Sequence, residues 1–213
     1  AKFMNAGQTC VAPDYLFLPE ARVDAFIEAA RRIVPARYPR LDSTDYTSIV
    51  DRKGYQRLKA LIEDARSRSA EVINLLSGTA PDDTSRRIPP TLVKNVRDDM
   101  ALMQSEIFGP ILPIRTYRRL DDVIAYVNAR ERPLALYLFS NDRDRQARVV
   151  GRTMSGGVSI NDCAMHVAQH DLPFGGIGNS GMGQYHGFEG FMELSKLRPV
   201  FRQAARPLGA AFL

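Results

Sequence analysis

The amino-acid sequence predicts an α/β fold, a doubly wound and mostly parallel sheet with helices on both faces. Between residues 91 and 161, short runs of apolar and β-branched residues alternate with longer segments of helical periodicity. Strands that alternate with helices pair in parallel through right-handed crossovers. Hydrophobic residues make up 45% and charged residues 25% of the 213 residues, which is the composition of an ordinary soluble globular protein.

Strand and helix signals already alternate in the first part of the chain. Residues 11–18 end in the apolar run Tyr-Leu-Phe-Leu, which suits a buried strand. Residues 20–34 repeat apolar side chains at helical spacing, and Pro35 is expected to end that helix because proline cannot donate the next backbone hydrogen bond. The elements predicted up to residue 87 are a strand at 11–18, a helix at 20–34, a helix at 52–66, a strand at 71–76 and an exposed loop at 77–87.

The second part of the chain is regular until a glycine-rich segment. The elements predicted there are strands at 91–96, 111–117, 134–139 and 157–161 and helices at 120–129 and 143–154. Seven glycines then fall between Gly175 and Gly190, too many for a regular helix or strand. Residues 176–181 spell Gly-x-Gly-x-x-Gly, but a dinucleotide fingerprint needs a strand that leads into a helix, and the preceding Asp171-Leu-Pro-Phe is a turn. We therefore reject this segment as a Rossmann fingerprint.

Charge and apolar content exclude several classes of partner. The net charge is +5, but the basic residues are mixed with acidic ones and form no run of five like charges, so we expect no nucleic-acid partner. The longest apolar stretches, at 134–139 and 210–213, are far shorter than the ~20 residues of a membrane span. Two cysteines and three histidines give neither a disulfide framework nor a zinc signature, and we expect a reducing, cytoplasmic location.

Two cysteines are candidates for a reactive thiol. Cys10 lies in Asn-Ala-Gly-Gln-Thr-Cys, just before the first apolar run, and Gly7 in that segment can bring backbone amides close. A free thiol is only a few per cent ionised at neutral pH, so a nucleophile needs positive potential nearby. From the residues alone, Cys10 is as well explained as a buried small side chain as by a catalytic role. Cys163 has no glycine neighbours, and we interpret it as structural.

Three segments together resemble the aldehyde dehydrogenase superfamily: FMNAGQTC (3–10), SEIFGPILPI (105–114) and LPFGGIGNSGMGQYHG (172–187). They occur in the order of that family and at about its spacing. The ending NSGMGQYHG, with Gly-Val-Ser-Ile-Asn-Asp at 157–162, resembles the class 3 branch, which includes fatty, aromatic and coniferyl aldehyde dehydrogenases. Within that branch we favour a resemblance to the bacterial coniferyl-type members.

The resemblance implies a role for four residues. Cys10 would attack an aldehyde carbon to form a thiohemiacetal and then a thioester, and its backbone N–H would help to hold the oxyanion. Glu106 matches the residue that hydrogen-bonds the nicotinamide ribose of NAD or NADP, and Phe108 matches the aromatic residue beside that ring. Phe174 matches an aromatic residue that lines the substrate tunnel. Without the resemblance, Glu106 would be interpreted as a surface residue and Phe174 as a plug under a glycine loop.

The resemblance also implies a domain organisation. Residues 1–194 would form the catalytic domain, and 195–213 an oligomerisation strand and tail, with a strand at Leu197–Gln203 that pairs with another subunit. The NAD(P)-binding domain, the general base and the oxyanion-hole asparagine precede the cysteine motif in this family, so we expect Ala1 to be an internal start and the isolated chain to be inactive. We expect a homo-oligomer, with a dimer favoured.

Two other functions stay open. Cys10, His166 and Asn179 follow the order of a cysteine-dependent hydrolase, although the papain-type neighbourhood of the cysteine is absent and the chain has no tryptophan. A Cys–His pair within hydrogen-bond reach would support this alternative. The other alternative is a non-catalytic assembly module, in which the loop around Cys10 would be sealed or disordered.

Overall fold

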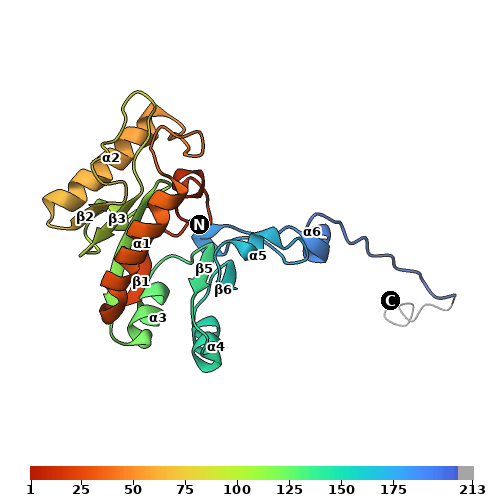
Figure 1. Ribbon diagram of the computed structural model, residues 1–213. Helices are drawn as coiled ribbons and strands as arrows, with labels where there is room; N and C mark the ends of the chain where they lie inside the picture. The colour runs from red at the N-terminus through yellow and green to blue at the C-terminus, as the bar shows by residue number, and fades with distance from the viewer. Residues whose placement is uncertain (206–213) are drawn as a thin grey trace.

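The computed structural model describes residues 1–205, which form a folded body followed by an extended C-terminal segment (Figure 1). The body has a larger part built on a four-stranded sheet and a smaller part built on a two-stranded sheet. The α/β class with parallel strands is confirmed. Within residues 1–205, no helix is both long and apolar enough to cross a membrane.

The larger part contains a mostly parallel sheet in the order β1-β4-β3-β2. Its strands are β1 (Leu16–Pro19), β2 (Glu71–Asn74), β3 (Thr91–Lys94) and β4 (Ile111–Tyr117). Strand β4 pairs in parallel with β1 and β3, while β2 runs antiparallel to β3 at the edge. The antiparallel edge follows from the connection: residues 75–90 join β2 to β3 without a helix that could return the chain for a parallel pair.

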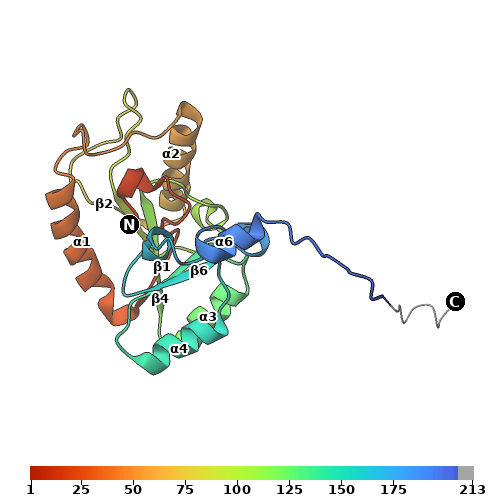
Figure 2. The same cartoon turned by 90° about the vertical axis from the view of Figure 1, so that its right-hand side faces the viewer.

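Two helices cover the two faces of this sheet, α1 (Val23–Arg37) on one and α2 (Arg52–Ser67) on the other (Figure 2). Neighbouring strand residues point to opposite faces, so Leu92 of β3 joins the core under α1 whereas Val93 joins the core under α2. The predicted helices on both faces are therefore present.

Pro35 does not end the first helix as predicted. Helix α1 continues to Arg37, and the Tyr38 N–H still donates to the Val34 carbonyl oxygen at 2.8 Å. Pro35 lacks an N–H of its own, but the residues after it keep theirs, and the Tyr38 N–H closes the last turn. The Tyr38 ring, 5.4 Å from the Tyr46 ring in an edge-on arrangement, packs this last turn against the loop that follows.

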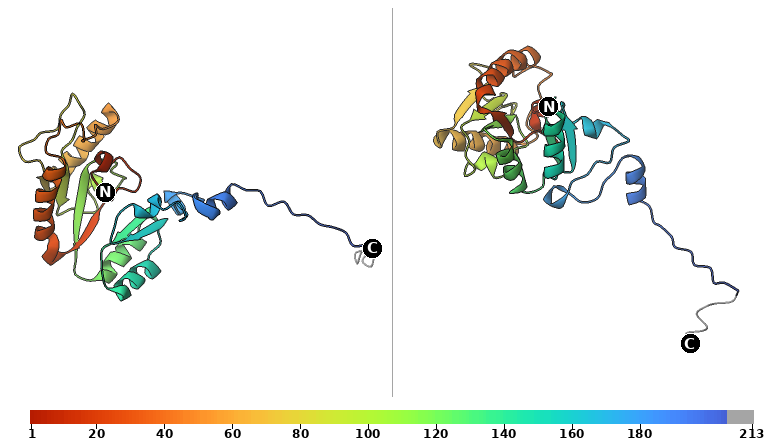
Figure 3. Two further views of the ribbon diagram at one scale, coloured as in Figure 1. Left: turned by 45° about the vertical axis from the view of Figure 1, so that its right-hand side comes forward. Right: turned by 90° about the horizontal axis from the view of Figure 1, so that it is seen from below.

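The smaller part consists of the parallel pair β5 (Ala135–Leu138) and β6 (Gly157–Ile160) with helices α3 (Leu120–Asn128) and α4 (Arg143–Arg152) (Figure 3). The predicted sheet is thus divided into two hydrogen-bonded sheets. A hydrogen bond from the Tyr137 hydroxyl of β5 to the Val11 carbonyl oxygen, at 2.7 Å, joins the smaller part to the segment before β1.

Six short helical turns complete the elements of the described residues. They are η1 (Met4–Gly7), η2 (Glu20–Arg22), η3 (Ala101–Met103), α5 (Met165–Ala168), η4 (Gly178–Ser180) and α6 (Gly187–Glu193). Residues 176–181 fold back on themselves, since a Cβ on Gly176 would lie 2.1 Å from the Ser180 carbonyl oxygen. No strand directly precedes this turn, the three residues of η4 lie inside it, and no helix begins directly after it, so residues 176–181 do not have the strand-turn-helix geometry that a dinucleotide fingerprint requires.

The strand predicted at Leu197–Gln203 is absent from the chain taken alone. These residues have no regular secondary structure and extend away from the body (Figure 1). A strand requires a hydrogen-bonded neighbour, and within residues 1–205 this segment has none. Pairing with a second subunit remains a prediction, and the part of the predicted tail at 206–213 lies outside the described residues.

Candidate active site

The loop that carries Cys10 begins with a tight turn that packs against the Glu106 segment. Gly7 has a left-handed φ of +74°, and a Cβ on it would lie 2.2 Å from the Gly109 carbonyl oxygen. Only glycine allows this contact. Two of the segments that suggested the family are therefore in backbone contact, although about 100 residues separate them.

The Gln8 side chain fixes the same loop on its other side. Its Nε2 donates to the carbonyl oxygens of Asn5 and Ser48, both at 3.1 Å, and its Oε1 accepts from the Val50 N–H at 2.8 Å. The loop is thus bound to the segment before α2 through two hydrogen bonds, to Ser48 and Val50, while the third, to Asn5, closes the loop on itself. Cys10 follows in a turn closed by the Ala12 N–H on the Thr9 carbonyl oxygen, and it is exposed.

Tyr137 lies behind this turn. Burial and, next, the negative charge of a Cys163 thiolate raise the pKa of Tyr137 to about 12. The phenol therefore stays protonated at neutral pH and remains a donor to the Val11 carbonyl oxygen. Cys163 is half-buried, and burial raises the pKa of its thiol. Of the two cysteines only Cys10 is exposed, so the loop around it is not sealed.

The Glu106 segment presents two exposed side chains on either side of a buried one. Glu106 and Phe108 are exposed, whereas Ile107 is fully buried. Desolvation and the neighbouring Asp14 carboxylate raise the pKa of Glu106, and the positive charges of Lys2 and Arg57 oppose that rise. The exposed carboxylate can accept hydrogen bonds from ribose hydroxyls, and the exposed ring offers a face to a nicotinamide, so these residues fit the role that the resemblance gives them.

An ion pair between a buried lysine and a half-buried aspartate supports this segment. Lys2 is only 5% exposed, and its Nζ lies 3.5 Å from Asp14 Oδ1. The same Asp14 oxygen accepts the Ile107 N–H at 3.2 Å. Burial lowers the pKa of Lys2, and the Asp14 carboxylate opposes that fall.

Arg57 of α2 holds the opposite side of the same segment. Its Nη1 donates to the Glu106 carbonyl oxygen at 3.3 Å and its Nη2 to the Ile107 carbonyl oxygen at 2.6 Å. Sequence reasoning missed Lys2, Asp14 and Arg57, because each one by itself has the pattern of a solvated surface residue. The only sequence feature that could have indicated this ion pair is that a lysine and an aspartate lie on either side of the cysteine motif.

Phe174 lies under the glycine-rich segment. It is 7% exposed and forms a two-residue antiparallel bridge with Tyr185, whose ring packs edge-on at 5.5 Å. The His166 ring lies 5.9 Å from it and 6.0 Å from the Tyr137 ring. Aromatic side chains thus connect the Cys10 turn to Phe174, and the chain taken alone leaves Phe174 in the position of a plug.

His166 does not form a catalytic pair with Cys10. Its Nδ1 shares a 2.9 Å hydrogen bond with Ser159 Oγ, and its Nε2 is buried without a hydrogen-bond partner. Burial lowers the pKa of His166, so the ring is neutral at physiological pH. Asn179 lies in η4, inside the glycine-rich turn. His166 thus makes no hydrogen bond with Cys10, and the structure does not support a cysteine-dependent hydrolase built on Cys10, His166 and Asn179.

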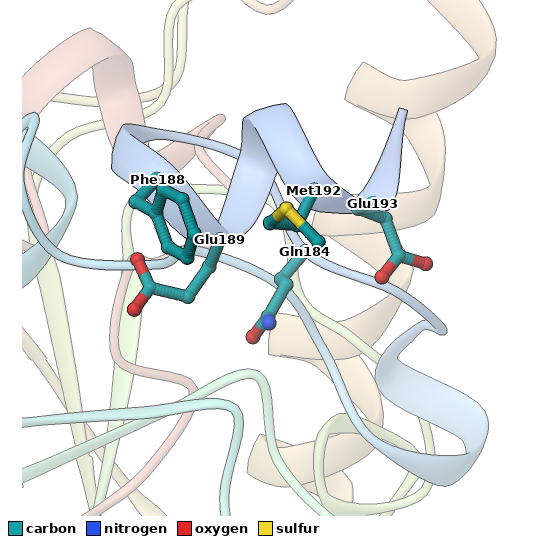
Figure 4. A pocket seen from close by; sticks show the side chains of 5 residues that line it. All are labelled: Gln184, Phe188, Glu189, Met192 and Glu193. Carbon is teal, nitrogen blue, oxygen red and sulfur yellow. The ribbon is translucent and has the colours of Figure 1, made fainter. Parts of the chain in front are cut away.

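Two further features lie outside this arrangement. A shallow depression on α6 is lined by Gln184, Phe188, Glu189, Met192 and Glu193 (Figure 4), none of which is a predicted site residue. Among residues 1–205, no group of three or more histidine, cysteine, aspartate or glutamate side chains could hold a metal ion.

Comparison with known families decides the assignment: residues 1–200 match the pattern described as "Aldehyde dehydrogenase family". The chain belongs to the aldehyde dehydrogenase family. This aldehyde dehydrogenase chain is 51% identical over 201 residues to a probable coniferyl aldehyde dehydrogenase of Pseudomonas aeruginosa, covering 94% of the chain and 41% of that protein. It is 46% identical over 215 residues to a coniferyl aldehyde dehydrogenase of Pseudomonas sp. strain HR199, covering 100% of the chain and 44% of the relative.

A solved structure, the substrate-bound state of AldH from Staphylococcus aureus, superposes with a TM-score of 0.85 at 41% identity. The superposition covers 98% of the chain and 46% of that structure. The aldehyde dehydrogenase chain thus spans less than half the length of the curated relatives it matches.

Proposed function

We propose that this chain is the catalytic half of an NAD(P)-dependent aldehyde dehydrogenase, with Cys10 as the nucleophile. The observation that carries the proposal is the backbone contact between Gly7 and Gly109. It sets an exposed cysteine loop against a segment that offers an exposed carboxylate and an exposed aromatic ring. An oxidation through a covalent thioester needs such a nucleophile beside a site for the nicotinamide.

The residues of the chain suggest the following course. The Cys10 thiolate attacks the carbonyl carbon of the aldehyde, and the Cys10 N–H holds the oxyanion that forms. When bound, NAD or NADP supplies an acceptor for the hydride that leaves this carbon. The product on Cys10 is a thioester, which water hydrolyses to the carboxylic acid and the free thiol. Glu106 binds the ribose hydroxyls and Phe108 orients the ring.

For the substrate we propose an aromatic or long-chain aldehyde of the coniferyl type. The two Pseudomonas relatives are described as coniferyl aldehyde dehydrogenases, one of them as probable. Phe174, with the rings of Tyr185 and His166 around it, would form the apolar wall of the substrate tunnel. Aromatic side chains favour a flat ring through edge-on and offset contacts.

Activity requires parts that this chain does not supply. Glu106 and Phe108 would contact only the nicotinamide end of the cofactor, while the phosphates and the adenine need a nucleotide-binding half. The isolated chain should therefore show neither aldehyde oxidation nor measurable NAD or NADP affinity in calorimetry. Micromolar binding would contradict this division of roles and would restore 176–181 as a phosphate site.

A fusion tests the proposal directly. The part of the Pseudomonas aeruginosa relative that precedes its matched region is placed before Ala1. Formation of NAD(P)H from coniferyl aldehyde is then followed by the absorbance of the reduced cofactor. We expect activity that Cys10→Ser abolishes and Cys163→Ser leaves intact. A fusion that is folded, binds the cofactor and oxidises no aldehyde would refute the proposal.

Assembly as a homodimer and a cytoplasmic location complete the proposal. Three apolar side chains of the C-terminal segment are between 69% and 86% exposed in the single chain: Leu197, Val200 and Phe201. Neighbouring apolar side chains exposed to this extent mark a surface that another protein covers. We propose that 197–203 forms a strand against a second subunit. We propose a cytoplasmic location because two cysteines without a short spacing form no disulfide framework of the kind that secreted domains carry.

A further inference from the structure

Phe108 has a backbone conformation that a bulky residue rarely adopts. Its φ is +47°, in the left-handed region, which glycine adopts readily, asparagine sometimes and bulky residues rarely. Its ring is nevertheless 39% exposed, so burial of the ring contributes little to holding this conformation. Some other contact must fix it.

The peptide groups on the two sides of Ile107 show which contact this is. The peptide between Glu106 and Ile107 is held at both ends, by Asp14 on its N–H and by Arg57 on its carbonyl oxygen. The peptide between Ile107 and Phe108 is held by the 2.6 Å bond from Arg57 to the Ile107 carbonyl oxygen.

Loss of that bond would free a specific motion. A half-turn of the peptide between Ile107 and Phe108 changes ψ of Ile107 and φ of Phe108 together, reverses the carbonyl and takes Phe108 to a negative φ. The motion relieves the unfavourable conformation of Phe108, and the guanidinium of Arg57 opposes it because it grips two successive carbonyls with one rigid fork.

We propose that Arg57 is a positioning residue that keeps Phe108 in its left-handed conformation and Glu106 beside it. The inference rests on the proposed function only for its effect on the cofactor. Arg57 touches neither the substrate nor the reacting atoms. It acts through the backbone of 106–108, from a helix that the family motifs do not include.

The first test uses the chain itself. Backbone resonances of Ile107 and Phe108 are compared in the wild type and in Arg57→Ala. Arg66→Ala is the matched control, since Arg66 lies on the same helix and its Nη1 bonds the exposed Glu63 carboxylate at 2.7 Å. Arg57→Ala should shift the signals of both residues and Arg66→Ala should not. Unchanged signals in Arg57→Ala would overturn the inference.

The second test uses the fusion with an upstream nucleotide-binding half. Arg57→Ala should raise KM for NAD(P) about tenfold, as expected when hydrogen bonds to a charged group no longer hold a binding residue. Alkylation of Cys10 should keep its rate, because Gln8 and not Arg57 anchors that loop. Arg57→Lys should recover only part of the lost affinity. The lysine ammonium can still donate to a carbonyl oxygen, but it cannot hold two carbonyls with the geometry of the guanidinium.

The outcomes separate the two proposals. If the Phe108 signals shift while KM stays constant, the positioning role stands and the contact of Glu106 and Phe108 with the cofactor is refuted. If KM, Cys10 alkylation and thermal stability all change together, Arg57 acts only as a general structural support and the positioning role is refuted.

Discussion

Replacing Gly7 by alanine tests whether the contact between the Cys10 loop and the Glu106 segment is as close as described. The added methyl group would lie 2.2 Å from the Gly109 carbonyl oxygen and 2.5 Å from its carbon, and neither backbone atom can turn aside. Alanine at a φ of +74° costs about 1–2 kcal/mol, and the overpacking costs about 1–3 kcal/mol. We expect the free energy of unfolding to fall by about 2–5 kcal/mol.

Thermal or urea unfolding of the purified chain measures this loss. For a chain of this size, each kcal/mol lowers the melting temperature by about 2–4 °C. The reactivity of Cys10 toward iodoacetamide should change in the same variant, because the methyl group must displace the loop that carries the thiol.

Gly78→Ala provides the control. Gly78 has a φ of +76°, and a Cβ on it meets nothing within 4 Å, so this variant isolates the cost of the left-handed conformation. It should lose about 1–2 kcal/mol and leave Cys10 reactivity unchanged. If both alanine variants lose the same stability, the close approach of Gly7 to Gly109 is wrong, and the Cys10 loop and the Glu106 segment are not in the contact on which the proposed function rests.

Three further predictions concern the thiols, the C-terminus and pH. Iodoacetamide should alkylate the exposed Cys10 much faster than the half-buried Cys163, and equal rates by mass spectrometry would count against Cys10 as the nucleophile. In sedimentation experiments, the chain should self-associate while a version that ends at Ser195 should not; two monomers of equal stability would show that the tail has no role. The hydrogen bond from the Ala101 N–H and, next, the Arg68 guanidinium lower the pKa of Asp64 in the folded chain. The stability that the Asp64 carboxylate contributes is therefore present above its unfolded pKa of about 3.9. That contribution is lost as the pH falls through the lower pKa of the folded state. Asp64→Asn should therefore destabilise the chain at pH 7 but not in strong acid, and an equal loss at both pH values in urea titrations would contradict this assignment.

The regular elements were largely predictable, because their signals are local. Helix α2 and strand β4 match the residues that their periodicity indicates, to within one residue at each end. The division into two sheets was not predictable, since the side chains of a strand do not reveal which neighbour it pairs with. Helix α5 was missed because its four residues are too few to show a period.

The sequence suggested residues for the candidate site, whose roles stay predictions, but it did not suggest the contacts that support them. The resemblance supplied Cys10, Glu106, Phe108 and Phe174 as separate positions, and the periodicity of the sequence says nothing about the contact between Gly7 and Gly109. The bonds of Asp14 and Arg57 to the Ile107 peptide groups span 93 and 50 residues. Contacts of such length depend on the whole fold, so a local pattern cannot disclose them.

The glycine-rich segment has a consequence for what a sequence signature can tell. A Cβ on Gly175 would lie 2.1 Å from the Gly183 carbonyl oxygen, and one on Gly176 equally close to that of Ser180. These positions exclude every larger residue on steric grounds, whatever reaction the protein catalyses. A descendant of this protein that had lost Cys10 and served another purpose would still need the same glycines to fold. Detection of the segment in a genome therefore diagnoses an architecture and not a reaction.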